Sequence, residues 1–292
     1  MPSGDFQKIG VLGLGLIGGS MAQAAKKADC TVFGLDRDSQ VMDKAGAIGI
    51  RPMTAEVLPQ LDVLLTALYP GATLKEMERL APHLSQSTLV IDLCGVKMAA
   101  SVKPFRRFCA SPLSRYGFPY LGGHPMAGKE TRGWDFSQAG LFQGASMILT
   151  PGEGFDPALY DKAARFFLSL GFGRITRSNP RSHDRIIALT SQLAHVISCA
   201  YIQSPTAEDF SGFSAGSFQD MTRVARLNET MWTELFWDNR EFLTQEIRGM
   251  AGRLEHYANL LETGDKEGLF DLLRDAREKK EESDSILRGG KR

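Results

Sequence analysis

Short apolar runs alternate with helical patterns along the first part of the chain. Continuous apolar runs of about four to eight residues are typical of strands that are buried on both faces of a sheet. The expected strands are residues 8–15, 31–36, 63–69, 88–94, 120–123, 146–151 and 173–178. Apolar residues recur with helical spacing in residues 18–28, 73–84 and 157–171. This alternation predicts an α/β fold built on a doubly wound, mostly parallel sheet.

Only helical patterns follow the last of these strands. Residues 229–262 are expected to form one long helix, because apolar side chains recur there every three or four positions. Asn228 is the predicted N-cap of this helix, Gly264 its predicted end, and Asp265 the predicted cap of a further helix. The long apolar stripe predicts a helical dimer interface, with packing inside one chain as the alternative.

The change from alternating elements to helices alone predicts two domains, an α/β domain over residues 1–178 and an all-α domain over residues 179–292. A length of 292 residues suits one large or two ordinary domains. Lysine plus arginine and aspartate plus glutamate each number 34, so the net charge is zero. No excess of positive charge favours nucleic acid or an anionic membrane surface as a partner.

The cysteines and the apolar segments bear on the compartment. None of the cysteines forms a C-x-x-C pair or has metal-ligand spacing to a histidine, so we expect reduced thiols and no metal site. No apolar run reaches about 18 residues, so no membrane helix is expected. The apolar segment 9–25 is similar to a signal peptide, but its glycines have motif spacing, and we expect a cytoplasmic protein. The cysteines are Cys30, Cys94, Cys109 and Cys199.

The segment GLGLIG, residues 13–18, fits the G-x-G-x-x-G pattern of dinucleotide-binding loops. It follows an expected strand and opens an expected helix, whose amino end would receive the phosphates. Gly13 permits a tight turn, Gly15 lets the backbone approach a pyrophosphate, and Gly18 lets helix and strand pack closely. The pattern predicts a Rossmann-type nucleotide site. The cofactor-binding residues expected in this segment are Gly13, Gly15, Leu16, Ile17 and Gly18.

Asp36 ends the second expected strand, roughly 20 residues after the glycine loop. Its carboxylate can accept hydrogen bonds from the adenosine ribose and would repel a 2′-phosphate, which favours NAD over NADP. Arg37 follows directly and can stack on adenine or neutralise a phosphate. A solvated carboxylate at a strand end is the alternative for Asp36. NAD is the expected cofactor.

His124 lies in the segment LGGHPMAGKE, residues 121–130, between glycines and a proline. Glycine and proline disfavour helices and strand interiors, so we expect a shaped loop that presents one imidazole. A lone histidine is by default a structural residue. Here, however, a redox cofactor is expected, and hydride removal from an alcohol requires a group that accepts the hydroxyl proton. A near-neutral imidazole suits that task.

Five segments, LGLGLIGGS, GGHPMAGKE, LFQGASMILTP, SHD and FQDMTRVARLNETMW, occur in this order and spacing. Together they resemble the prephenate/arogenate dehydrogenase family of tyrosine biosynthesis, from about Lys8 to Leu273. The resemblance implies an oxidative decarboxylation. A cyclohexadienol gives its C4 hydride to NAD, loses its ring carboxylate as carbon dioxide and becomes a phenol. The implied substrate is prephenate or arogenate.

The resemblance also implies roles for three residues. It maps the acceptor of the C4 hydroxyl proton onto His124. It maps a carboxylate-binding arginine onto Arg223 and a residue that meets the substrate side chain onto His195. Without the resemblance, Arg223 would be an ion-pair partner of Asp220 one helical turn away, and His195 a core histidine.

Three further positions match the family near the pocket. Glu130 would be a gating or pocket-polarity residue, and Trp232 a pocket residue, with simple packing as its alternative. The family usually has D-x-x-S-V-K after the strand, whereas this chain reads DLCGVK. Gly95 therefore replaces a serine expected near the nicotinamide and the substrate hydroxyl. Either a water replaces the missing hydroxyl, or His124 works with less support.

The segment SQLAH, residues 191–195, replaces the family's S-H-L-P-H. Gln192 and Ala194 stand in place of the first histidine and the proline, while His195 is retained. Family members that prefer arogenate often lack this second histidine, so its presence favours prephenate. The sequence leaves the choice between the two substrates open.

Two other classes of protein share parts of the pattern. A β-hydroxyacid-type dehydrogenase requires a catalytic lysine in its helical half, and no lysine lies between Lys162 and Lys266. A non-catalytic NAD sensor that signals through a helical dimer would need neither His124 nor Arg223. We therefore expect an NAD-dependent prephenate dehydrogenase that acts as a homodimer.

Overall fold

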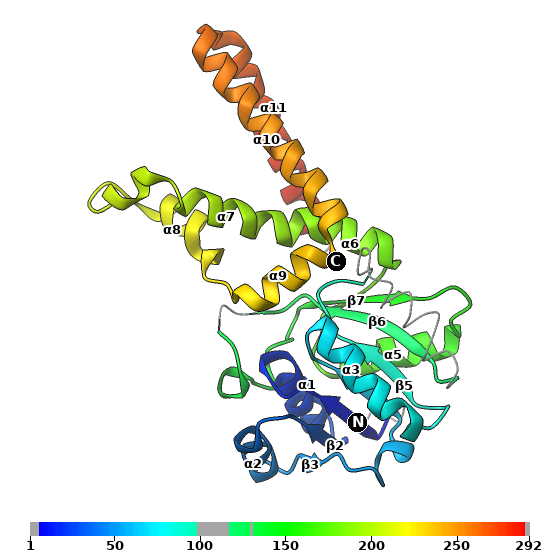
Figure 1. The fold of residues 1–292 in the computed structure, drawn as a ribbon. Coiled ribbons are helices and arrows are strands. Elements are labelled where there is room, and N and C mark those ends of the chain that lie inside the picture. Colours follow the sequence, from blue (N-terminus) through cyan, green and yellow to red (C-terminus); the bar gives the residue numbers. More distant parts are fainter. Residues whose placement is uncertain (1–5, 98–116, 129–130, 290–292) are drawn as a thin grey trace. The chain divides into compact units, whose positions relative to one another are not determined.

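An eight-stranded sheet forms the centre of the first part of the chain (Figure 1). The computed structural model describes residues 6–97, 117–128 and 131–289. The strand order is β3-β2-β1-β4-β5-β6-β7-β8, and every neighbouring pair is parallel except β6 and β7. The predicted mostly parallel, doubly wound sheet is confirmed. The strands are β1 (Lys8–Leu12), β2 (Thr31–Leu35), β3 (Arg51–Pro52), β4 (Val63–Thr66), β5 (Leu89–Asp92), β6 (Tyr120–Pro125), β7 (Ser146–Pro151) and β8 (Arg174–Arg177).

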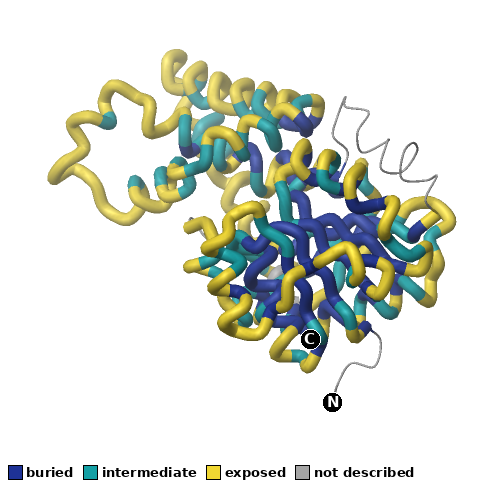
Figure 2. The backbone as a smooth tube through the Cα atoms, turned by 60° about the horizontal axis from the view of Figure 1, so that its bottom comes forward, coloured by how far each residue is buried: buried dark blue, intermediate teal, exposed yellow. Residues whose placement is uncertain are grey.

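Helices cover both faces of this sheet, and its strands are the buried centre of this part of the chain (Figure 2). Helices α1, α2 and α5 bury apolar residues against one face, and α3 with the short helices η1 and η2 covers the other. In β4, Val63 and Leu65 join the first core, whereas Leu64 joins the second. Successive side chains of a strand point to opposite faces, which explains the continuous apolar runs. These elements are α1 (Leu16–Lys27), α2 (Ser39–Ala47), η1 (Leu58–Gln60), α3 (Pro70–Leu80), η2 (Ala81–His83), η4 (Trp134–Phe136) and α5 (Pro157–Ser169).

The strand order reverses between β1 and β4, where sheets of this kind bind ligands beyond the carboxyl ends of the strands. The glycine loop at residues 13–18 follows β1, and Gly95 follows β5. His124 is the second-last residue of β6, which runs parallel to β5. The topology therefore brings three of the expected site features to one edge of the sheet.

A continuous helix extends from Pro180 to Ile202, with a π-helical turn in its middle. By length and composition alone, this is one helix in the described residues that could cross a membrane. Core helices of water-soluble proteins meet the same criterion, and this helix carries the buried polar residues His183, Asp184 and Gln192. Its parts are α6 (Pro180–Ile187), η5 (Ala188–Leu193) and α7 (Ala194–Ile202), and η6 (Pro205–Asp209), α8 (Gly216–Thr222) and η7 (Arg223–Ala225) follow.

The single helix predicted over residues 229–262 is wrong, because two helices, α9 (Glu229–Asp238) and α10 (Arg240–Thr263), meet at Asn239. Asn239 is fully buried, with non-helical backbone angles. Its side-chain amide donates to the backbone oxygen of Asp184 at 2.9 Å and to Oε1 of Gln192 at 2.7 Å. These tertiary contacts interrupt the helix that the apolar spacing predicts. The N-cap is confirmed, since the Asn228 side chain accepts from the Met231 N–H at 2.8 Å.

The chain divides into two compact units, residues 1–243 and residues 244–292. In the second unit, α11 (Lys266–Gly289) runs alongside α10 (Figure 1). Gly264 has a φ of +69°, and the Asp265 side chain accepts from the Gly268 N–H at 2.8 Å, so both predicted turn residues are confirmed. Large apolar side chains of this hairpin are exposed, namely Leu254, Leu261, Phe270 and Leu273.

Candidate active site

The glycine loop between β1 and α1 is shaped by close backbone contacts. Gly13 has a φ of +85°, and a Cβ there would lie 2.8 Å from the Ala67 carbonyl oxygen. A Cβ on Gly18 would lie 1.8 Å from the Gly13 carbonyl oxygen, so helix and loop approach too closely for any side chain. Gly15 differs, because a Cβ there would have no heavy atom within 4 Å. The space beside Gly15 is open to a ligand, and the other two glycines serve the fold.

The amino end of α1 suits an anion. Gly15 precedes the first helical residues, Leu16 and Ile17, without any side-chain cap, and the first turn contains no acidic residue. Backbone N–H groups at an uncapped helix start carry partial positive charge and can hold a pyrophosphate. The residues present therefore fit the phosphates of a dinucleotide.

Asp36 lies directly beside this loop. One of its carboxylate oxygens accepts from the Leu14 N–H at 2.7 Å, and the other accepts from the Asp38 N–H at 3.0 Å. Each carboxylate oxygen can accept more than one hydrogen bond, so both retain capacity for ribose hydroxyls. Arg37 is exposed next to it, at the end of the strand. The arrangement suits the adenosine end of NAD.

His124 lies inside strand β6 and not in a loop, which corrects the sequence-based expectation. Its partner across the antiparallel pair is Ile148 of β7. The glycines before it allow close packing: a Cβ on Gly122 would lie 2.2 Å from Oγ1 of Thr150, and one on Gly123 would lie 3.0 Å from the Asp92 carbonyl oxygen. The glycines therefore reflect crowding within a strand and not a turn.

A chain of hydrogen bonds leads from His124 into the core. Nδ1 of His124 lies 2.9 Å from Nε2 of His183, and Nδ1 of His183 lies 2.6 Å from Oδ1 of Asp184. The side chains of His183 and Asp184 are completely buried. Asp184 Oδ1 also accepts from the Lys97 backbone N–H at 2.8 Å. The two histidines, 59 residues apart in sequence, thus form one polar unit between strand β6 and helix α6.

The environment of His124 favours its neutral form. Burial, followed by the neighbouring His183 and then Lys97, lowers the pKa of His124 well below the ordinary value of 6.5. A neutral imidazole at ordinary pH has one nitrogen that accepts a proton. His124 is therefore available as a proton acceptor throughout the neutral range.

A buried ion pair anchors the loop that follows β5. The Lys97 ammonium group contacts Oδ1 of Asp92, and the Tyr120 hydroxyl contacts Oδ2 of the same carboxylate. Asp92 Oδ1 also accepts from the Cys94 N–H at 3.1 Å. Both charged side chains are almost completely buried, so their pairing is required to offset lost hydration. The loop that carries Gly95 is thereby fixed at the edge of the sheet.

Gly95 faces the imidazole of His124. A Cβ at Gly95 would lie 3.9 Å from Nε2 of His124 and 3.6 Å from a methyl group of Leu235 on α9. There is accordingly room for a side chain at this position. The structure brings Gly95, His124 and helix α9 together, and leaves Nε2 of His124 facing the position where the family has its serine.

His195 and Trp232 form a second part of the site. Their rings are in contact, with centroids 3.9 Å apart and planes tilted by 32°. Nδ1 of His195 lies 2.9 Å from the Ser191 carbonyl oxygen, to which it donates. In a neutral ring with its proton on Nδ1, Nε2 is an acceptor. Trp232 precedes Leu235 by three residues on α9, so the two side chains share a helix face. Trp232, on the helix that also meets Gly95, thus lies against His195 of α7.

The remaining predicted site residues are Arg223 and Glu130. Arg223 is exposed at the start of η7, which packs against α7, the helix that carries His195. Gln192, which replaces a family histidine, donates to the Leu235 carbonyl oxygen at 3.1 Å and accepts from Asn239. Gln192 therefore links α9 to the long helix. Glu130 lies outside the residues that the structure describes.

The sequence alone does not reveal the partners of His124. The SHD segment contains His183 and Asp184, and the DLCGVK segment contains Lys97, but neither motif indicates what these side chains contact. His183 and Asp184 are flanked by Arg181, Ser182 and Arg185, so no apolar pattern around them indicates that they are buried.

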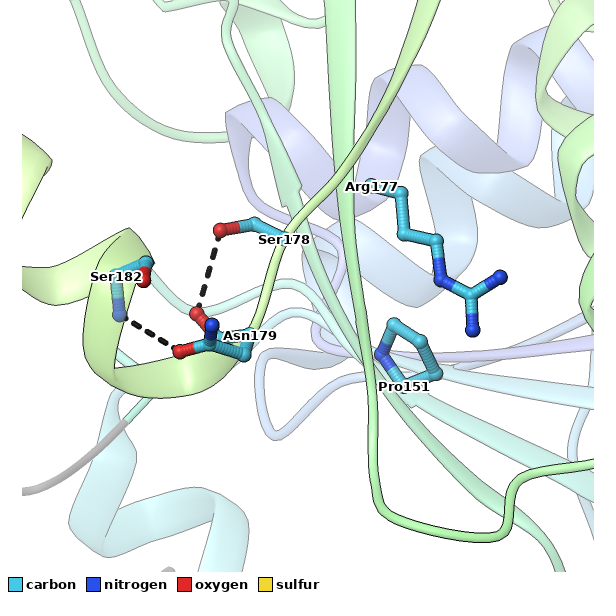
Figure 3. A pocket seen from close by; sticks show the side chains of 5 residues that line it. All are labelled: Pro151, Arg177, Ser178, Asn179 and Ser182. Carbon is cyan, nitrogen blue, oxygen red and sulfur yellow. Dashed lines mark hydrogen bonds between the residues drawn. The ribbon is translucent and has the colours of Figure 1, made fainter.

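An open pocket of about 530 Å³ lies elsewhere, where β8 leads into α6 (Figure 3). In Figure 3 the Asn179 side chain turns toward Ser182. Its Oδ1 accepts a hydrogen bond from the Ser182 N–H at 2.9 Å, so Asn179 is the N-cap of α6. None of the predicted site residues lines this pocket. Asn179, one of its polar lining residues, already caps the helix. The lining residues are Pro151, Arg177, Ser178, Asn179 and Ser182.

Two family models match consecutive parts of the chain. The model described as prephenate dehydrogenase, nucleotide-binding domain, matches residues 21–176. The model described as prephenate dehydrogenase, dimerization domain, matches residues 179–275. Together they cover strands β2 to β7, nearly all of β8, the long helix and most of the helices that follow, whereas β1 and the glycine loop precede the first match.

Individual relatives agree with the family models. A cyclohexadienyl dehydrogenase of Zymomonas mobilis is 27% identical over 93% of this chain and 94% of that protein. A prephenate dehydrogenase of Bacillus subtilis is 26% identical over 91% of this chain and 73% of that protein. The crystal structure of Synechocystis arogenate dehydrogenase has a TM-score of 0.80 at 26% identity, over 94% of this chain and 99% of that one.

A further structure shares the fold. Prephenate dehydrogenase from Aquifex aeolicus, in complex with hydroxyphenyl propionate and NAD+, has a TM-score of 0.82 at 24% identity, over 94% of this chain and 98% of that one. The matched models, the relatives and the site at the sheet edge agree with one another. The chain belongs to the prephenate dehydrogenase family.

Proposed function

We propose that this protein catalyses the NAD-dependent oxidative decarboxylation of prephenate to 4-hydroxyphenylpyruvate and carbon dioxide. Membership of the family makes the chain an NAD-dependent dehydrogenase. The position of His124 is the observation that supports its role as the base. Its Nε2 faces Gly95 at the sheet edge that also carries the glycine loop, and its Nδ1 is bonded to His183.

The proposed reaction begins with proton removal by His124. Its Nε2 takes the proton of the C4 hydroxyl, and the O–H electron pair becomes the second carbon–oxygen bond as a hydride leaves C4. When bound, NAD supplies the hydride acceptor. The ring then loses its carboxylate as carbon dioxide, and the electrons of the broken carbon–carbon bond complete the aromatic ring. The phenolate oxygen takes the proton back from His124, so no net proton is released.

Helix α9 would close the pocket over the ring. Leu235 lies beside Gly95, and Trp232 lies one turn away against His195. Apolar and aromatic walls exclude water, which strengthens hydrogen bonds inside the site. We assign His195 and Trp232 to the substrate side chain, and Arg223 to a carboxylate.

Replacing Arg223 with alanine is expected to raise the KM for prephenate about tenfold or more, because a charge-assisted pair with a carboxylate is lost. The kcat should change much less, since the reacting C4 centre is untouched. Steady-state kinetics measure both. Arg226→Ala removes an exposed arginine three residues away and serves as the matched control. A KM for Arg223→Ala equal to that of the control would remove Arg223 from the binding site.

Serine at position 95 is expected to be tolerated and to raise kcat/KM by a factor of about two to ten, the worth of one hydrogen bond. The nearest atoms to a Cβ are at 3.6 Å, and the new hydroxyl could reach Nε2 of His124 or the substrate oxygen. Gly95→Ala adds the carbon without the hydroxyl and should leave kcat/KM unchanged. Equal kinetics for the serine and alanine variants would show that the family's serine has no equivalent function here.

Arogenate is the second candidate substrate, because a relative of similar identity is an arogenate dehydrogenase. Retention of His195 supports prephenate. The two substrates differ in the side chain that His195 would meet, since prephenate carries a keto group and arogenate an ammonium group. Values of kcat/KM measured side by side decide between them. A higher kcat/KM for arogenate would overturn the prephenate assignment.

We infer a homodimer formed through the helical part of the chain. The exposed apolar residues of the α10–α11 hairpin, with Leu254, Leu261 and Phe270 each at least 60% exposed, support this inference. The match to a model described as a dimerization domain supports it as well. We also retain the proposed domain division after residue 178, since β8 ends at Arg177 and helices follow.

We infer a cytoplasmic location for the protein. Cys30, Cys94 and Cys199 are free thiols, as a reducing compartment would maintain. Burial raises the pKa of Cys94 to about 12, so this thiol, next to Gly95, stays protonated and unreactive. Neither nucleic acid nor a membrane is a proposed partner of this electrically neutral chain.

A further inference from the structure

With His183 neutral, the hydrogen-bonded chain from His124 to Asp184 has a fixed direction. A carboxylate oxygen only accepts hydrogen bonds, so Nδ1 of His183 must carry the proton in its 2.6 Å contact with Asp184. Nε2 of a neutral His183 then has a lone pair and can only accept. Nδ1 of His124, 2.9 Å away, must therefore be the donor. In a neutral His124 this leaves Nε2 without a proton.

We propose that His183 and Asp184 act as a positioning pair that holds His124 in the tautomer with its proton on Nδ1. This inference rests on the proposed function for its consequence, since only that tautomer presents a lone pair to the substrate hydroxyl. The opposite tautomer would present an N–H at Nε2, which cannot accept a proton. His183 and Asp184 touch neither substrate nor cofactor in this scheme and act only through His124.

Asp184 is held in place by contacts from two other segments. It belongs to α6, its carboxylate accepts from the Lys97 N–H at 2.8 Å, and its carbonyl oxygen accepts from the Asn239 side chain at 2.9 Å. The same Lys97 belongs to the loop that carries Gly95, and its ammonium group pairs with Asp92. Lys97 thus connects Asp184, which orients His183, to the loop that carries Gly95 and faces His124. A network satisfied in this way gives a single, rigid arrangement.

The pair also supports the protonated state of His124. After the proton transfer, the imidazolium of His124 still donates from Nδ1 to His183, which in turn donates to the Asp184 carboxylate. The negative charge of Asp184 lies one residue beyond His183 in the hydrogen-bonded chain and stabilises the positive charge that forms only during the reaction. An interaction that strengthens in this way lowers the barrier and raises kcat.

Nitrogen-15 NMR of the full-length protein without ligand tests the tautomer directly. The chain has five histidines, so single substitutions can assign the imidazole signals. At neutral pH we expect His124 and His183 each to carry the proton on Nδ1. A proton on Nε2 of His124 would overturn the inference, as would a doubly protonated His183. This measurement needs no activity, so its failure is distinguishable from failure of the proposed function.

Variants of His183 test the effect on the reaction. His183→Phe keeps a ring but removes both nitrogens, and we expect loss of the fixed tautomer of His124. The kcat for the preferred substrate should fall on the order of tenfold or more, with little change in KM. His183→Gln places an amide oxygen where Nε2 was, and should restore the Nδ1 proton of His124 and part of kcat.

His83→Phe makes the same change at an exposed histidine and is the matched control. An unchanged kcat and an unchanged His124 tautomer in His183→Phe would overturn the inference. If His183→Phe does not fold, the NMR spectra of the wild type and of His183→Gln still test the inference. Both spectra show which nitrogen of His124 carries the proton. Absence of turnover by the wild type with prephenate and with arogenate would instead contradict the proposed function.

Discussion

Replacing His124 with asparagine is expected to lower kcat by a factor of about 10² to 10⁴, the usual contribution of a positioned general base. The asparagine amide can occupy the place of Nδ1 and keep a donor toward His183, while no acceptor remains at the place of Nε2. The KM should change only a few-fold, because proton acceptance acts mainly in the transition state. Steady-state kinetics with prephenate and NAD measure both quantities.

His83→Asn is the control for the loss of a histidine outside the site. A normal kcat in His124→Asn would remove His124 from the chemistry. The pH dependence gives an independent check, because the pKa of His124 is lowered well below 6.5 and only the neutral form accepts a proton. The kcat/KM should therefore stay level as pH falls to about 6.5 and decline only through the lowered pKa. A decline centred at or above that value would contradict the described environment.

Alanine at Gly15 is expected to weaken NAD binding about tenfold or more while leaving the fold intact, because we propose that the cofactor occupies the open space beside Gly15. A Cβ there meets no protein atom within 4 Å, and the backbone has a φ of −68°. Alanine at Gly18 should instead destabilise the domain by about 1–3 kcal/mol, since its Cβ would lie 1.8 Å from the Gly13 oxygen. Calorimetric NAD titration and thermal unfolding separate the two effects.

Gly46→Ala is the matched control for these variants, since Gly46 lies in α2 and a Cβ there also meets nothing within 4 Å. Its dissociation constant for NAD should equal that of the wild type. Wild-type NAD affinity in Gly15→Ala would show that no cofactor approaches this loop. An unchanged unfolding temperature in Gly18→Ala would mean that helix and loop can separate at little cost.

The α/β part of the fold follows from the sequence because its signals are local. Continuous apolar runs mark the strands, and their alternation with helices predicts parallel connections. The sequence alone places the glycine loop beside Asp36, since their spacing follows from one βαβ unit. The structure adds the distinction between glycines that serve the fold and Gly15, which faces open space.

Long-range contacts explain what sequence reasoning could not predict. The local sequence predicts a loop at His124, but pairing with β7 places it in a strand, and that partner is distant in sequence. The break at Asn239 depends on bonds to Asp184 and Gln192, more than 40 residues away. The bond between His124 and His183 likewise spans 59 residues. Each of these features is set by a tertiary contact that no local pattern contains.

The proposed reaction is tested most directly by mixing the full-length protein with prephenate and NAD while following NADH absorbance and carbon dioxide release together. We predict one NADH and one carbon dioxide for each prephenate consumed, with 4-hydroxyphenylpyruvate as the organic product. The His124→Asn protein, assayed in parallel, should show almost none of this turnover. No NADH formation by the wild type with prephenate would contradict the central claim.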